Sequence, residues 1–377
     1  MAIKSLKASL INYLSNIPGW HTKRHLVSIE SDDWGSIRMP SKKIFDILLK
    51  EGIDLLTGEG SRYNKYDSLE TAADLTELFD VLSSIKDCTK RPAVLTPFSV
   101  VANPDFHKIK ESDFSEYFYE PFTDTMERFP DCKDSYKYLK SGIENRLFVP
   151  QFHGREHLNV KVWMRALNEG HQKTILAFNN GMWGLSTAND PKIKLELQAA
   201  FDLIDAEDLI YHKEVLISGL NLFEEKFGYR ANFFVPPNGA LSSKLETTCI
   251  EGGIKYLSAS RKEIEPIGHG KSRKRYHWLG QKSNAGILYI NRNCFFEPNQ
   301  LGRDWVDSCL NDISIAFRWR KPAVISTHRV NYIGALYKEN RENGLRQLSM
   351  LLKQIMINWP DAEFVTSGEL GDIISNE

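Results

Sequence analysis

The chain has 377 residues, and its 48 Lys and Arg residues against 49 Asp and Glu residues give a formal net charge of −1. A balance this even excludes a generally basic nucleic-acid-binding protein, whose cationic excess would show in the composition. Hydrophobic residues make up 42% of the chain, which excludes a disordered protein and is enough to bury a large core. No apolar run approaches about 18 residues, so we predict no membrane span.

The first 24 residues predict a helical extension rather than a secretory signal, because polar residues, a proline and a glycine interrupt the apolar stretch that a signal needs. The residues spaced as one face of a short amphipathic helix are Leu6, Leu10, Ile11 and Leu14. The five cysteines are widely spaced and contain no CxxC pair, which argues against a thiolate zinc cluster or a disulfide framework. We therefore expect a cytoplasmic protein in a reducing compartment.

The rest of the chain alternates short β-like runs with amphipathic segments. The expected strands cover residues 25–29, 92–96, 147–152, 231–235, 255–259, 286–290, 323–327 and 363–366. The expected helices cover residues 42–51, 72–86, 160–169, 193–227 and 345–358, while residues 174–178 fit either type. This alternation predicts a mainly parallel sheet with helical crossovers, and the absence of a Pro/Gly/Ser linker favours one elaborated domain. Functional residues of such folds gather where the strands end.

Two neighbouring carboxylates, Asp32 and Asp33, follow the first expected strand. On irregular backbone they point in different directions, so one can bind a cation while the other holds or accepts a proton. Aspartate is also favoured at helix N-caps and in turns, and that structural interpretation stays open for this pair alone.

The second candidate site is the pair His153 and His157, four residues apart after the third expected strand. We expect both imidazoles on one helical face, close enough to share a metal. Two imidazoles and a carboxylate make a facial site for zinc or a similar divalent ion, with positions open to water. Glu156 does not directly follow the first histidine, so the motif differs from the HExxH of zinc proteases. A surface histidine pair at a helix start is the alternative.

Two further strand ends carry candidate residues. A rigid Pro236–Pro237 turn with Asn238 presents backbone N–H groups that can line a ligand groove or contact an oxyanion, although such turns also serve simply to stop strands. His328 ends another strand, and histidine is the natural proton donor near neutral pH. The basic run at residues 271–275 is interpreted as a solvated loop. No G-x-S-x-G, P-loop or G-x-G-x-x-G pattern competes.

The order of these four sites resembles the polysaccharide deacetylases of carbohydrate esterase family 4. Residues 30–35 resemble the family's T-F-D-D-G motif with Trp34 inserted, and the two histidines match the spacing of H-[ST]-x-x-H. Residues 235–239 are similar to R-P-P-Y-G, and residues 325–328 to L-x-x-H. The family's arginine is Val235 here, and we find no counterpart of its Asp-Trp motif. The candidates to replace the arginine from another strand end are Arg38, Arg155, Arg292 and Arg329.

The resemblance, which covers roughly His25 to Leu370, implies a distorted (β/α)7-type barrel at residues 25–377, with insertions around 40–90 and 103–147. It implies removal of acetyl groups from a carbohydrate and a divalent metal, zinc first, with cobalt and nickel as alternatives. The implied site consists of the metal ligands Asp33, His153 and His157, the base Asp32, the acid His328, and the substrate or oxyanion contacts Asn238, Pro237 and Trp34. The alternatives are a barrel that binds glycan or metal without turnover, and a metallohydrolase with a different substrate.

Overall fold

The computed structural model describes residues 13–58, 60–187, 190–193 and 195–376. Most of the N-terminal helix that the sequence predicts falls on residues 1–12 and so lies outside the described residues, while Tyr13 to Ser15 are helical. No helix in these described ranges is both long and apolar enough to cross a membrane.

The described residues form a nine-stranded sheet in which every pair of neighbouring strands is parallel. Its strand order is β10-β7-β6-β5-β2-β1-β12-β11, and β13 also pairs with β1. The strands are β1 (Leu26–Trp34), β2 (Leu95–Ser99), β5 (Gln151–Phe152), β6 (Phe233–Phe234), β7 (Tyr256–Ser258), β10 (Leu288–Ile290), β11 (Cys294–Phe295), β12 (Ala323–His328) and β13 (Glu363–Phe364). Every residue of β1, the central strand, is buried.

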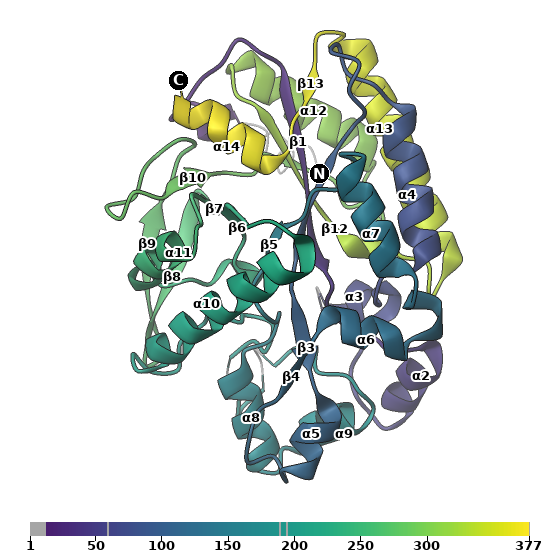
Figure 1. The fold of residues 1–377 in the computed structure, drawn as a ribbon, viewed down its shortest axis with the longest axis vertical. Coiled ribbons are helices and arrows are strands. Elements are labelled where there is room, and N and C mark those ends of the chain that lie inside the picture. Colours follow the sequence, from purple (N-terminus) through teal and green to yellow (C-terminus); the bar gives the residue numbers. More distant parts are fainter. Residues whose placement is uncertain (1–12, 59, 188–189, 194, 377) are drawn as a thin grey trace.

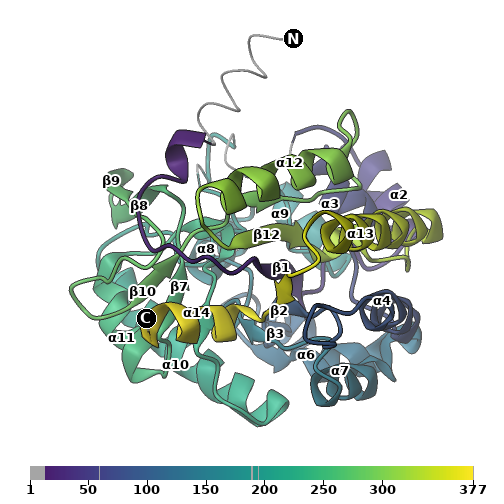
Figure 2. The ribbon, with the colours of Figure 1, turned by 90° about the horizontal axis from the view of Figure 1, so that it is seen from above.

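Helices cover the outside of this sheet (Figures 1 and 2). They are α2 (Lys42–Lys50), α3 (Ser61–Tyr66), α4 (Ala72–Ser84), α5 (Phe106–Glu111), α6 (Phe122–Arg128), α7 (Ser135–Glu144), α8 (Val160–Asn168), α9 (Gln172–Asn179), α10 (Asp208–Phe227), α11 (Glu246–Glu251), α12 (Trp305–Arg318), α13 (Lys338–Asn358) and α14 (Ser367–Asn376). In Figure 1, β1 points downward, and α2, α5, α8 and α9 lie at the bottom, beyond its carboxyl end. Two small antiparallel hairpins complete the fold: β3 (Ala102–Pro104) with β4 (Tyr119–Pro121), and β8 (Lys262–Gly268) with β9 (Lys271–Tyr276).

The two ends of the curled sheet, β10 and β11, follow each other directly in the chain. β10 pairs with β7 and β11 pairs with β12, and only residues 291–293 separate β10 from β11. Asn291 Nδ2 donates to the Ala259 carbonyl at 2.7 Å on the β7 side, and Asn293 N donates to the Val324 carbonyl at 3.2 Å on the β12 side. We call residues 291–293 the seam. The result is a distorted (β/α)7-type barrel, which confirms the predicted fold class.

Two local predictions from the sequence differ from the structure. Within the helix expected at residues 193–227, α10 is the one helix among the described residues. Residues 174–178, which fit either type, belong to the helix α9. The basic run at residues 271–275 is strand β9 rather than a loop. Its arginines face the acids of β8, with Glu263 opposite Arg275 and Glu265 opposite Arg273 in the register. Pairing of opposite charges across the hairpin stabilises this strand, which periodicity alone does not reveal.

Candidate active site

A distortion at the end of β1 separates the two neighbouring aspartates. The pairing of β1 with β2 shifts register between Ser31 and Trp34, and Asp33 has a φ of 77°, in the left-handed region. Such an irregularity re-aims the side chains on either side of it. As a result, Asp33 faces the histidines that follow β5, whereas Asp32 lies beside His328 in the register with β12.

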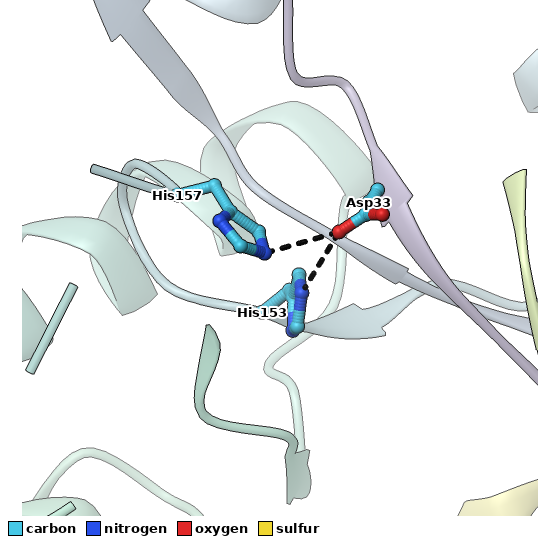
Figure 3. Close-up of side chains that lie close together, drawn as sticks. All are labelled: Asp33, His153 and His157. Atoms are coloured by element: carbon cyan, nitrogen blue, oxygen red, sulfur yellow. Dashed lines mark ion pairs between the residues drawn. The ribbon is translucent and has the colours of Figure 1, made fainter. Parts of the chain in front are cut away.

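Asp33, His153 and His157 converge in the interior (Figure 3). Asp33 Oδ1 lies 3.0 Å from His157 Nε2 and 3.6 Å from His153 Nε2, and all three side chains are buried. The two histidines do not share a helical face as the sequence predicts, because the chain between β5 and α8 is a loop that turns at Gly154, where φ is 106°. The loop still brings their ring centroids to 5.0 Å.

The protonation pattern of His153 indicates that this group fits a cation. His153 Nδ1 is 2.7 Å from the Val235 carbonyl, and a carbonyl only accepts, so Nδ1 carries the proton. In the neutral ring, Nε2 then presents a lone pair to Asp33, and this buried atom has no hydrogen-bond partner among the described residues. His153 Nε2 and the Asp33 carboxylate are then two acceptors that face each other without a proton between them. A cation bound between them would remove this repulsion. Zinc ligands at about 2.0–2.2 Å in tetrahedral geometry lie about 3.4 Å apart, in line with the spacing of these atoms.

The titration of these groups also suits metal ligands. Burial alone raises the pKa of Asp33, but the two neighbouring histidines, His153 and His157, outweigh it and hold the pKa well below its usual value. Burial lowers the pKa of His157. A carboxylate and neutral imidazoles are the forms that bind zinc and similar ions.

Arg292, in the seam, holds the neighbouring Asp32. Its Nη1 and Nη2 donate to the two Asp32 oxygens, each at 2.6 Å, and its Nε donates to Glu30 Oε2 at 2.7 Å. Burial alone raises the pKa of Asp32, yet Arg292 outweighs it, and the pKa of Asp32 lies below its usual value. Of the four arginines that the sequence offers as replacements for the missing family arginine, Arg292 is the one bound to Asp32.

His328 is held by a residue that the sequence did not point to. Glu297 Oε1 lies 2.5 Å from His328 Nδ1, which leaves Nε2 on the side of Asp32, 3.8 Å from Asp32 Oδ2. Burial lowers the pKa of His328, but Glu297 and the aspartates outweigh it and raise the pKa to about 9. His328 is therefore protonated at neutral pH.

Two further side chains fix Glu297. Its Oε2 accepts hydrogen bonds from Arg62 Nη1 at 2.6 Å and from Asn331 Nδ2 at 2.9 Å. A carboxylate with this many partners has one orientation, so it orients the imidazole of His328. The register explains the contact: Phe295 pairs with Ser326, and two residues further along both strands Glu297 reaches His328. A short apolar run followed by an acid at a strand end was the signal in the sequence.

A single cavity of about 1170 Å³ joins these groups. The predicted site residues among its lining are Asp32, Asp33, His153, His157, Asn238 and His328. Asn238 has a φ of 53° and lies in the turn after β6. A cavity of this volume can enclose a drug-sized ligand.

Trp34 and Pro237, which the sequence predicts at the substrate, are not among the described residues that line this cavity. Trp34 is 1% exposed, packs edge-on against Phe148 and donates its Nε1 hydrogen to Ser31 Oγ. Pro237 is buried beside the Gly154 turn. The structure thus places the Trp34 indole away from this cavity, and a substrate contact of Trp34 or Pro237 stays a prediction.

Comparisons with known proteins add a structural likeness. No family model matches the chain, and no curated protein matches it. A probable polysaccharide deacetylase from Pseudomonas aeruginosa PAO1 is similar in structure, with 10% identity, 94% of this chain and 92% of that chain covered, and a TM-score of 0.49. A putative polysaccharide deacetylase from Mycobacterium smegmatis has 10% identity, covers 95% and 93%, and has a TM-score of 0.44.

A CE4 family pseudoenzyme from Bacillus anthracis is also similar, with 9% identity, 93% of this chain and 66% of that chain covered, and a TM-score of 0.38. Because every one of these TM-scores is below 0.5, we base the function on the contacts in the cavity alone. Among solved structures, the chain is thus similar to polysaccharide deacetylases and CE4 family members, at low sequence identity.

Proposed function

We propose that the protein is a metal-dependent hydrolase that removes acetyl groups from a carbohydrate. The observation that carries the proposal is the buried group of Asp33, His153 and His157, with the lone pair of His153 Nε2 aimed at a carboxylate. These three side chains would hold the metal, with zinc as the first choice and cobalt or nickel as alternatives. A divalent ion held there supplies Lewis acidity, which makes water a nucleophile near neutral pH and polarises a carbonyl.

In this proposal the other residues move the protons. Asp32, kept ionised by Arg292, accepts the proton of the water that attacks the acetyl carbonyl. His328, kept protonated by Glu297, donates the Nε2 proton to the departing amine or alkoxide of the sugar. Asn238 lies in the cavity wall, and in this proposal its backbone N–H stabilises the oxyanion. The products are acetate and a free amino or hydroxyl group on the sugar.

The opposite charge states of Asp32 and His328 support their assignment as base and acid. Asp32 and His328 share one cavity, yet one is held ionised and the other protonated by separate partners, Arg292 and Glu297. A base and an acid that coexist near neutral pH are what hydrolysis of an amide or ester needs.

Metal analysis combined with acetate release from a panel of acetylated glycans tests the proposal. We expect Asp32→Asn to retain metal and lose turnover, and His153→Ala to lose metal. His107→Ala is the matched control, because His107 is exposed on α5 and pairs only with Glu111 among the described residues. Bound metal without acetate release from any acetylated glycan would favour the non-catalytic barrel or a different substrate, and full activity of Asp32→Asn would refute the assigned base.

A further inference from the structure

Arg261 lies in the wall of the same cavity, three residues after the end of β7, and is partly buried. Its Nη2 donates to Asn16 Oδ1 at 3.2 Å, and the same oxygen accepts from Asn293 Nδ2 at 3.2 Å. Asn16 is 1% exposed and thus fixed in place. Through Asn16, Arg261 is therefore linked to Asn293 of the seam. Asn293 is the neighbour of Arg292, the residue that positions the proposed base.

Among the described residues, Arg261 has no acidic partner, in contrast to Arg292 and Arg62. Arg292 pairs with Asp32 and Arg62 pairs with Glu297, whereas no carboxylate of the described residues lies within 4.0 Å of Arg261. Burial alone lowers the pKa of its guanidinium. A half-buried cation that gives up hydration without a counter-charge costs free energy unless a ligand compensates for it.

The acids closest to Arg261 along the chain are already engaged by other groups. Glu263 is 2.7 Å from His277 Nε2, and Glu265 is 2.7 Å from Arg273 Nη2. On the catalytic side of the cavity, Arg292 matches the charge of Asp32 and the histidines contact Asp33. The wall at Arg261 therefore keeps a positive charge that the described residues do not neutralise.

We propose that the cavity takes an acetylated sugar that also carries an anionic group, a carboxylate or a phosphate, and that Arg261 is the specificity-determining residue that binds this group. The sugar part of this inference rests on the proposed function. The guanidinium matches a carboxylate or a phosphate with two parallel hydrogen bonds, and such charge-assisted pairs are stronger than hydrogen bonds to neutral hydroxyl groups.

Calorimetric binding to the metal-loaded Asp32→Asn full chain tests the inference without turnover. The probes are neutral N-acetylglucosamine, its 1-phosphate, and an N-acetylated uronic acid, so that the two anionic arms separate phosphate from carboxylate. We expect at least one anionic sugar to bind about tenfold or more tightly than the neutral sugar. Adding Arg261→Gln should remove that preference, and Arg261→Lys should keep part of it.

The control is Arg303→Gln, because Arg303 also lines the cavity but is exposed. Equal affinity for neutral and anionic sugars would overturn the inference, as would a preference that survives Arg261→Gln. Thermal unfolding of each variant identifies a folding defect, and Arg261→Lys tests the charge if the glutamine variant unfolds.

Acetate release by the wild-type chain separates this inference from the proposed function. If kcat/KM is equal for neutral and anionic sugars, the hydrolase proposal stands and the role of Arg261 is refuted. If no sugar releases acetate while binding of an anionic sugar still depends on Arg261, the hydrolase proposal fails and the anion site stands.

Discussion

Replacing Glu297 by glutamine should shift the alkaline limit of activity to lower pH. Glu297 Oε1 is 2.5 Å from His328 Nδ1, and this carboxylate is the strongest of the groups that raise the pKa of His328 to about 9. A hydrogen bond to a charged group is worth about 1.5–3 kcal/mol, and one pKa unit corresponds to about 1.36 kcal/mol. The substitution should therefore lower the pKa of His328 by about one to two units.

The assay is acetate release by the metal-loaded protein between pH 6 and 10. Because the proposed acid His328 must be protonated to donate its proton, the wild type should keep its rate up to about pH 9, whereas Glu297→Gln should lose it above about pH 7–8. At pH 8.5 the variant should be about tenfold slower, and near pH 6.5 the two rates should approach each other.

An NMR titration of the His328 imidazole in the metal-free protein gives the pKa directly. Asp361→Asn is the control, because Asp361 contacts the imidazole of His25, which is not among the described residues that line the cavity. An alkaline limit that stays at the same pH in Glu297→Gln, with an unchanged His328 titration, would refute the coupling between the two residues.

Three further predictions concern the same buried groups. Arg292→Met should lower the free energy of unfolding by about 3–5 kcal/mol in a denaturant titration, because two buried carboxylates lose their partner, whereas Arg292→Lys should fold better but turn over slowly. The folded-state pKa of His328 lies above its unfolded value. The stabilising contribution of protonated His328, about 3 kcal/mol, is therefore complete below pH 6.5 and is lost as the pH rises through about 9. The difference in free energy of unfolding between wild type and His328→Gln should shrink over that range. Adding zinc to chelated protein at about 100 times its dissociation constant should stabilise the fold by about 2.7 kcal/mol, seen as a higher Tm, and Asp33→Ala should abolish the increase.

The parts of the site that follow from strand ends were predictable from the sequence. Asp33, His153 and His328 each come just at or after a short apolar run, and the carboxyl ends of parallel strands meet at one edge. Sheet order therefore brings these residues to one edge, and the convergence of Asp33 with the two histidines in one group agrees with the metal site that the resemblance implies.

The parts that depend on backbone detail or on register were not predictable. The φ of 77° at Asp33 follows from a register shift against β2, for which no residue of the pair is diagnostic. Arg292 was one of four candidates, and only the position of the seam, between β10 and β11, selects it. Glu297 is 31 residues from His328 in the chain, and the pairing of β11 with β12 alone brings them together.

The seam also makes the orientation of Asp32, the proposed base, depend on the link between the two ends of the sheet. The same three residues bridge the two ends of the sheet and carry the guanidinium that clamps Asp32. Inserting one residue into the seam would change the spacing between β10 and β11. The same insertion would move the Arg292 guanidinium away from Asp32. This short connection therefore links the strand arrangement to the position of Asp32.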